Sequence, residues 1–78
     1  MPVLWYFRET ALQELVQRES GQVLRYRLTG EEGPDHNKRF FVEVDLNGAS
    51  IGAGNGRSKK EAEQMAAKAA IEKLEQEI

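Results

Sequence analysis

A helix start followed by a stripe of small apolar residues constrains this chain more than any other feature. Ser58 and Glu61 have the spacing of a capping box. In that motif the serine oxygen accepts a hydrogen bond from the third helical amide, and the glutamate reaches back to the N–H of the cap residue. A helix is therefore predicted to begin at Lys59. Its apolar positions lie on one face: Ala62, Ala66, Ala67, Ala70, Ile71 and Leu74. Because alanine is small, we expect this face to pack closely on a sheet.

The first turn of this helix carries cations where the helix dipole disfavours them. Lys59 and Lys60 stand at the positive end of the dipole, beside free backbone N–H groups, and Arg57 precedes them. Positive groups that converge in this way are suited to hold a phosphate. The approach to the helix is expected to have little steric bulk because it is rich in glycine: Gly52, Gly54 and Gly56. The alternative is an ordinary solvated helix start that carries lysines.

The rest of the chain predicts one more helix and a strand meander. Residues 9–19 read as a helix, because its apolar residues form one arc: Ala11, Leu12, Leu15 and Val16. Residues 23–28, 40–46 and 49–53 read as strands, and Asn47-Gly48 predicts a type I′ hairpin turn. The order helix, three strands, helix predicts an α+β, two-layer fold, with both helices on one face of a three-stranded antiparallel sheet.

Polar residues occupy the second face of the first predicted helix. Thr10, Gln13 and Glu14 share this face at helical spacing, and such groups suit ribose 2′-hydroxyls in a shallow RNA minor groove. A plain solvated face is the alternative. In the first strand, Arg25 and Arg27 are expected to face away from the core, either as solvated side chains or as peripheral phosphate contacts.

A turn-forming run separates the first two predicted strands: Gly33, Pro34, Asp35 and His36. His36 is the single histidine of the chain. With no second candidate ligand of its kind, we do not expect a metal site, and as a catalytic base it would lack a nucleophile.

These features together resemble a known family. The pattern Gly-x-Gly-Arg-Ser-Lys-Lys-x-Ala-Glu-x-x-Ala-Ala-x-x-Ala is similar to the C-terminal signature of double-stranded-RNA-binding domains, above all the copy in bacterial ribonuclease III. The resemblance covers residues 10–74 and implies an α-β-β-β-α fold. It also implies recognition of RNA duplexes over about 16 base pairs, without preference for DNA.

The resemblance assigns a role to each segment. It implies that the residues of the first helix and of the turn contact two minor grooves: Thr10, Gln13, Glu14, Gly33, Pro34, Asp35 and His36. It implies phosphate contacts at the start of the last helix: Arg57, Ser58, Lys59 and Lys60. Glu63 departs from the pattern, since many members have a third lysine there, although ribonuclease III copies often share the glutamate.

We do not expect this chain to be an enzyme by itself. The metal-binding motif of the ribonuclease III nuclease domain, which resembles E-x-L-E-F-L-G-D, does not occur in the sequence. We expect no cofactor for this chain, and Mg²⁺ only in a nuclease domain outside it. The carboxylates of Glu61, Glu63 and Glu72 are expected to be solvated on the helix exterior. RNA processing, including that of ribosomal RNA, is the implied role.

A net charge of −2 leaves a second hypothesis open, a protein-interaction module with weak or no RNA binding. Its support is the charge, an expected exposed Phe41 and an aromatic run that could drive self-association: Trp5, Tyr6 and Phe7.

Residues 1–8 are interpreted as a tail or linker, and residues 9–78 as the domain. The absence of cysteine fits a reducing compartment, so a cytoplasmic location is expected. No apolar run approaches the ~20 residues that cross a bilayer.

Overall fold

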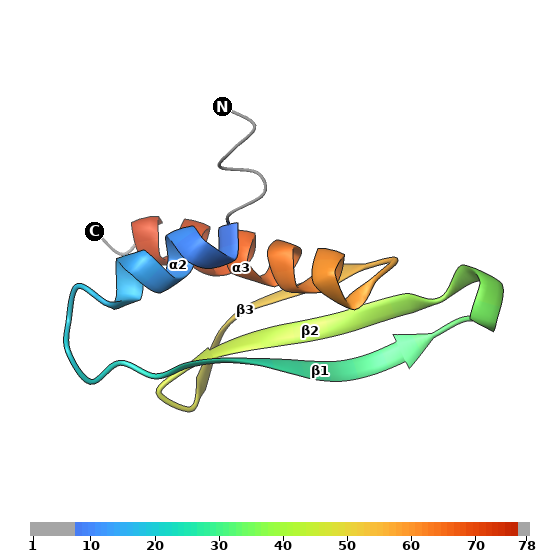
Figure 1. The fold of residues 1–78 in the computed structure, drawn as a ribbon, viewed down its shortest axis with the longest axis horizontal. Helices are drawn as coiled ribbons and strands as arrows, with labels where there is room; N and C mark the ends of the chain where they lie inside the picture. The colour runs from blue at the N-terminus through green and yellow to red at the C-terminus, as the bar shows by residue number, and fades with distance from the viewer. Residues whose placement is uncertain (1–7, 77–78) are drawn as a thin grey trace.

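The structure is a computed structural model that describes residues 8–76. Its elements follow one another along the chain as α2 (Arg8–Val16), β1 (Leu24–Glu32), the 3₁₀ helix η1 (Asp35–Asn37), β2 (Arg39–Leu46), β3 (Ala49–Gly56) and α3 (Lys59–Gln76). The strands form an antiparallel sheet in the order β1-β2-β3, and both helices lie over the same face of it (Figure 1). The predicted α-β-β-β-α fold is confirmed.

The core lies between the sheet and the helices, and the alternation of β2 supplies its centre. Val42 and Val44 point inward and are buried against Leu12 and Val16 of α2. The buried alanines of α3 complete the cluster: Ala62, Ala66, Ala67 and Ala70. The predicted alanine face is therefore confirmed.

Glycines of β3 allow α3 to lie very close to the sheet. A Cβ atom added at Gly52 would lie 2.6 Å from the carbonyl oxygen of Ala66 and 2.8 Å from the amide nitrogen of Ala70. A Cβ atom at Gly54 would overlap the amide nitrogen of Ala66. The low steric bulk expected of these glycines serves the packing of α3 on the sheet. They lie beneath the helix because small residues in both layers let the two backbones approach.

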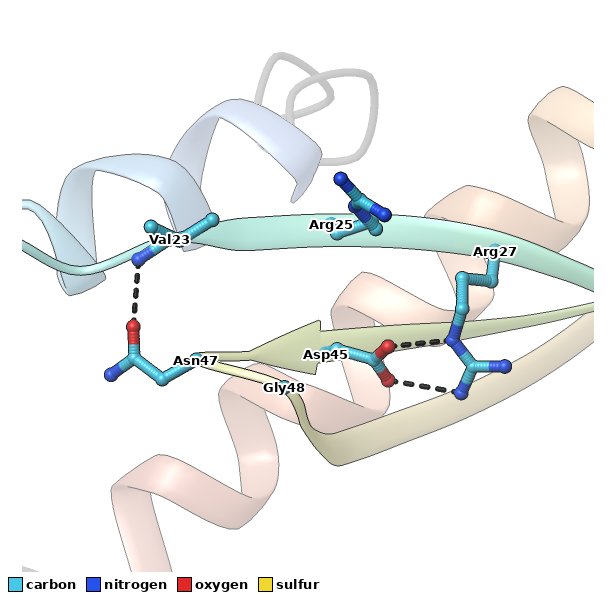
Figure 2. A pocket seen from close by; sticks show the side chains of 6 residues that line it. All are labelled: Val23, Arg25, Arg27, Asp45, Asn47 and Gly48. Carbon is cyan, nitrogen blue, oxygen red and sulfur yellow. Dashed lines mark hydrogen bonds and ion pairs between the residues drawn. The ribbon is translucent and has the colours of Figure 1, made fainter.

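The hairpin between β2 and β3 has the predicted turn. Asn47 and Gly48 both have positive φ, 54° and 88°, as a type I′ turn requires. The Asn47 side chain also contacts the residue that precedes β1. Its Oδ1 accepts a hydrogen bond from Val23 N at 2.9 Å (Figure 2). The backbone N–H of Asn47 in turn donates to the Val23 carbonyl oxygen at 2.8 Å.

Several element boundaries differ from the prediction, and β3, for example, continues to Gly56 instead of ending at residue 53. The first helix ends at Val16 instead of continuing to residue 19, because Val16 is the last residue of its apolar arc and turns follow up to Gly21. β1 continues to Glu32, since Glu32 still pairs with Arg39 of β2. A bulge between Leu28 and Gly30 interrupts the alternation, and Leu28 is 44% exposed instead of facing the core.

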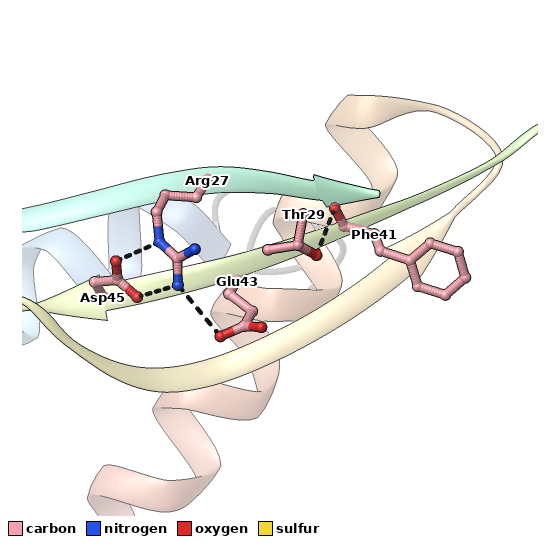
Figure 3. Close-up of polar contacts among 5 residues, drawn as sticks. All are labelled: Arg27, Thr29, Phe41, Glu43 and Asp45. Atoms are coloured by element: carbon pink, nitrogen blue, oxygen red, sulfur yellow. Dashed lines mark hydrogen bonds and ion pairs between the residues drawn. The ribbon is translucent and has the colours of Figure 1, made fainter. Parts of the chain in front are cut away.

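The outer face of the sheet carries an ion-pair cluster. Arg27 Nε donates to Asp45 Oδ2 at 2.6 Å and Arg27 Nη2 to Asp45 Oδ1 at 3.1 Å, while the same Nη2 lies 3.3 Å from Glu43 Oε1 (Figure 3). The hydrogen bond from Arg27 lowers the pKa of the Asp45 carboxyl. Arg27 is therefore neither purely solvated nor free for a phosphate, which were the two expectations for this side chain. Nearby, Phe41 is half-buried instead of fully exposed.

The aromatic run of residues 5–7 lies outside the described residues. The division into a tail of residues 1–8 and a domain of residues 9–78 therefore stays a prediction.

Candidate nucleic-acid interface

The capping box at the start of α3 fixes the backbone of the predicted phosphate site. Ser58 Oγ accepts a hydrogen bond from Glu61 N at 3.0 Å, as predicted. The Glu61 carboxylate, however, accepts from the N–H of Arg57 at 2.8 Å and not from that of Ser58. Gly56 is buried against the Glu61 side chain, which brings the carboxylate beneath Arg57. Glu61 is thus a structural cap, and the side chains of Arg57 and Lys59 are left exposed to solvent.

Lys60 has a partner that the sequence did not reveal. Its Nζ lies 2.8 Å from Glu9 Oε1, at the start of α2. The hydrogen bond with Glu9 raises the pKa of the Lys60 ammonium. Because Glu9 and Lys60 lie far apart in the sequence, no local motif could have found this pair.

Glu63 is partly buried beside the same pair, which corrects its expected solvation. Burial raises the pKa of the Glu63 carboxyl, and the nearby charge of Glu9 raises it further. The Tyr26 hydroxyl of β1 is buried near these carboxylates, and burial is also the main cause that raises its pKa. Two carboxylates and one ammonium therefore share the junction between α2 and α3. We call Glu9, Lys60 and Glu63 the junction cluster.

The turn between β1 and β2 is a short loop that contains the 3₁₀ helix η1. Gly33 has φ of 92°, and a Cβ atom there would lie 2.5 Å from the Asn37 carbonyl oxygen, so the position requires glycine. The backbone N–H of Asn37 donates to the Pro34 carbonyl oxygen at 2.9 Å and closes the turn of η1. The predicted site residues of this loop are all exposed: Gly33, Pro34, Asp35 and His36.

The loop lies against the phosphate site. Asp35, His36 and Arg57 line one open pocket, together with Asn37, Lys38 and Phe40. Lys38, which the sequence analysis did not single out, lies 3.2 Å from Glu31 Oε1 and 3.7 Å from Asp35 Oδ1 through its Nζ. The structure thus places the loop at residues 33–36 beside the start of α3, although the sequence analysis assigned these two segments to different RNA contacts.

The polar face of α2 is the third predicted segment. Thr10, Gln13 and Glu14 are exposed, whereas Leu12 and Val16 on the opposite side are buried. The start of α3 lies between α2 and the loop, because Lys60 contacts α2 and Arg57 shares the pocket with the loop (Figure 1). The α3 start is therefore adjacent to both other predicted segments, and the binding role of each residue stays a prediction.

Residues 8–76 contain neither a metal-ligand cluster nor a membrane-spanning helix. Within that range, no three histidine or acidic side chains converge as metal ligands would. Neither described helix has the length and apolar character needed to cross a membrane.

The family described as "Double-stranded RNA binding motif" matches residues 10–74. Because the match covers most of the chain, this protein belongs to the double-stranded-RNA-binding-motif family.

Curated relatives named "Ribonuclease 3" are similar to this chain over most of its length. The protein from Anoxybacillus flavithermus is 54% identical over 68 residues, which are 87% of this chain and 29% of that protein. The protein from Listeria monocytogenes is 52% identical over 66 residues, which are 85% of this chain and 29% of the relative. The chain thus spans less than a third of the length of these relatives.

Proposed function

We propose that this chain binds double-stranded RNA by recognising the shape of the duplex. The observation that carries the proposal is the position of the α3 start, which contacts α2 through Lys60 and shares a pocket with the β1–β2 loop through Arg57. A module that reads a duplex by shape needs separate contacts to successive minor grooves, with cations between them for the intervening phosphates. The family match is the independent support.

In this proposal, α2, the β1–β2 loop and the start of α3 each contact a different part of the RNA duplex. The exposed face of Thr10, Gln13 and Glu14 contacts 2′-hydroxyls in one minor groove, and the loop at residues 33–36 contacts the next groove. The α3 start holds phosphates of the intervening major groove with its exposed cations and its first N–H groups. These contacts leave the base sequence mostly unread.

The relatives extend the proposal to a biological setting. They are named as ribonucleases, and this chain matches less than a third of their length. We infer that the chain serves as the substrate-binding domain of a ribonuclease III-type nuclease, in RNA processing that includes ribosomal RNA, in the cytoplasm. The domain needs no cofactor of its own. Cleavage, with a divalent cation such as Mg²⁺, belongs to a separate nuclease domain.

A competition experiment between duplexes tests the proposal. An RNA duplex of about 20 base pairs, longer than the expected footprint, and a DNA duplex of the same sequence compete for the chain at two salt concentrations. We expect RNA to bind at least about tenfold more tightly, because B-form DNA lacks the 2′-hydroxyls and the wide, shallow groove. Gln13→Ala combined with Glu14→Ala should narrow this preference. Equal competition by both duplexes would contradict recognition through the minor groove.

A protein-interaction module is the second candidate. The observation that favours it is the net charge of −2, together with the neutralisation of Arg27 by Asp45 and Glu43 on the outer sheet face. Absence of any salt-dependent RNA binding would support this candidate. Deletion of residues 1–7 tests self-association separately, since a change in sedimentation without a change in RNA affinity would assign that activity to the aromatic run.

A further inference from the structure

We propose that Glu9 is an intramolecular counter-ion that competes with RNA phosphate for Lys60. Glu9 then determines how much Lys60 contributes to the binding of double-stranded RNA. The inference rests on the proposed function above and concerns the phosphate contacts of that same surface.

The geometry of the pair supports competition. Lys60 Nζ lies 2.8 Å from Glu9 Oε1, a distance at which the carboxylate takes the place that a phosphate oxygen would take. The side chain of Lys60 is 71% exposed, whereas that of Glu9 is only 23% exposed. The ammonium is therefore accessible to RNA while its carboxylate partner is held by the protein. A phosphate at Lys60 must replace Glu9 or share the ammonium with it.

The charge around Lys60 differs from the charge around its neighbour Lys59. Two carboxylates of the junction cluster, Glu9 and Glu63, surround the Lys60 ammonium. Lys59 is exposed and has no ion pair among the described residues. The two lysines look equivalent in sequence, yet only Lys59 presents an unneutralised charge to a polyanion. We therefore expect Lys59 to dominate the phosphate contact and Lys60 to contribute little while it is paired with Glu9.

Protonation of Glu63 in the junction cluster should weaken the competition between the carboxylates and RNA phosphate for Lys60. The groups that face one another there are Glu9 from α2, Lys60 and Glu63 from α3, and the Tyr26 hydroxyl from β1. As the pH falls, Glu63 takes up its proton before an ordinary glutamate does, because burial and Glu9 raise its pKa. The negative charge that faces Lys60 then decreases, and RNA binding should become tighter.

A double-mutant cycle tests the proposal. The unmodified chain, Glu9→Gln, Lys60→Ala and the double variant are titrated with the same RNA duplex, and Glu72→Gln serves as the control for net charge on an exposed part of α3. We expect Glu9→Gln to tighten binding at least about threefold beyond Glu72→Gln, the size of a released surface ion pair. Lys60→Ala should reduce affinity more in the Glu9→Gln background than in the unmodified chain.

The outcomes separate this inference from the proposed function. If the unmodified chain does not bind the duplex, the proposed function fails. If it binds but Glu9→Gln equals Glu72→Gln, or Lys60→Ala has the same effect in both backgrounds, the role of Glu9 is overturned. Weaker binding by a folded Glu9→Gln variant would also overturn it, since Glu9 would then support the contact instead of opposing it.

A second measurement does not require any change at Glu9. RNA affinity is measured between pH 7 and pH 5 for the unmodified chain and for Glu63→Gln. The two proteins differ only at residue 63, so the difference between their pH profiles reports on the junction cluster. We expect a smaller gain of affinity on acidification for Glu63→Gln. Identical pH profiles would contradict the proposed competition.

Discussion

Gly54 in β3 lies directly beneath Ala66 in α3, so close that a Cβ atom on Gly54 would overlap the amide nitrogen of Ala66. The contact is between backbones, and no side-chain rotation can relieve it. The distance between the sheet and the helix that bears the phosphate site is therefore determined by the absence of a side chain at this position.

Gly54→Ala should reduce the free energy of unfolding by about 3 kcal/mol, the upper range for overpacking of a well-packed core. The matched control is Gly30→Ala in β1, where the added Cβ would lie 3.9 Å from Phe41 Cδ2, an ordinary contact. Urea denaturation followed by circular dichroism measures both variants. If the two variants were equally stable, the close packing of β3 against α3 would not limit stability.

Lys59→Ala should weaken RNA binding for every duplex sequence and reduce the slope of log affinity against log salt by about 1, since one phosphate contact is lost. Lys73→Ala is the control, because Lys73 is an exposed lysine in the last turn of the same helix. Titrations at several salt concentrations measure both slopes. A slope that changes equally in the two variants would mean that only net charge matters.

Glu63→Gln should stabilise the protein at neutral pH. The pKa of Glu63 in the folded state is raised above its ordinary value of 4.5, so the folded state binds the proton more tightly than the unfolded state does. Stability due to this group is therefore present below that value and is lost as the pH rises through the raised pKa. Thermal unfolding at several pH values should show a midpoint gain for Glu63→Gln at pH 7 that shrinks towards pH 4. Glu72→Gln, on an exposed part of α3, is the control for the change in net charge.

Asp45→Asn should destabilise the protein at neutral pH and have little effect in strong acid. The hydrogen bond from Arg27 lowers the pKa of Asp45 in the folded state, so its contribution is present above the ordinary value of 3.8 and is lost as the pH falls through the lowered pKa. Thermal midpoints from pH 7 down to pH 2 measure the effect. Glu72→Gln is the control, because Glu72 is exposed on α3 and has no ion pair among the described residues. A constant difference across this pH range would exclude the Arg27 ion pair as its cause.

The sequence by itself determined the features that depend on neighbouring residues. The cap of α3 by Ser58, the turn at Asn47-Gly48 and the alanine face of α3 each follow from contacts within a few positions, so their patterns are local. The order of these elements then leaves one economical arrangement of two helices on a three-stranded sheet. The fold could therefore be predicted in advance, whereas the candidate site residues followed from the family resemblance and their binding roles stay predictions.

Only the tertiary structure decided the electrostatics of the site. Lys60 and Lys59 are adjacent in sequence, but Glu9 reaches Lys60 alone because α2 packs beside that side of α3. The register between β1 and β2 likewise brings Arg27 to Asp45 and neutralises a cation that sequence alone left open for phosphate. Charges act through space, and the distances between them depend on how separate elements pack. For this reason, the sequence identified where the cations lie, and the packing determined which of them are free to bind.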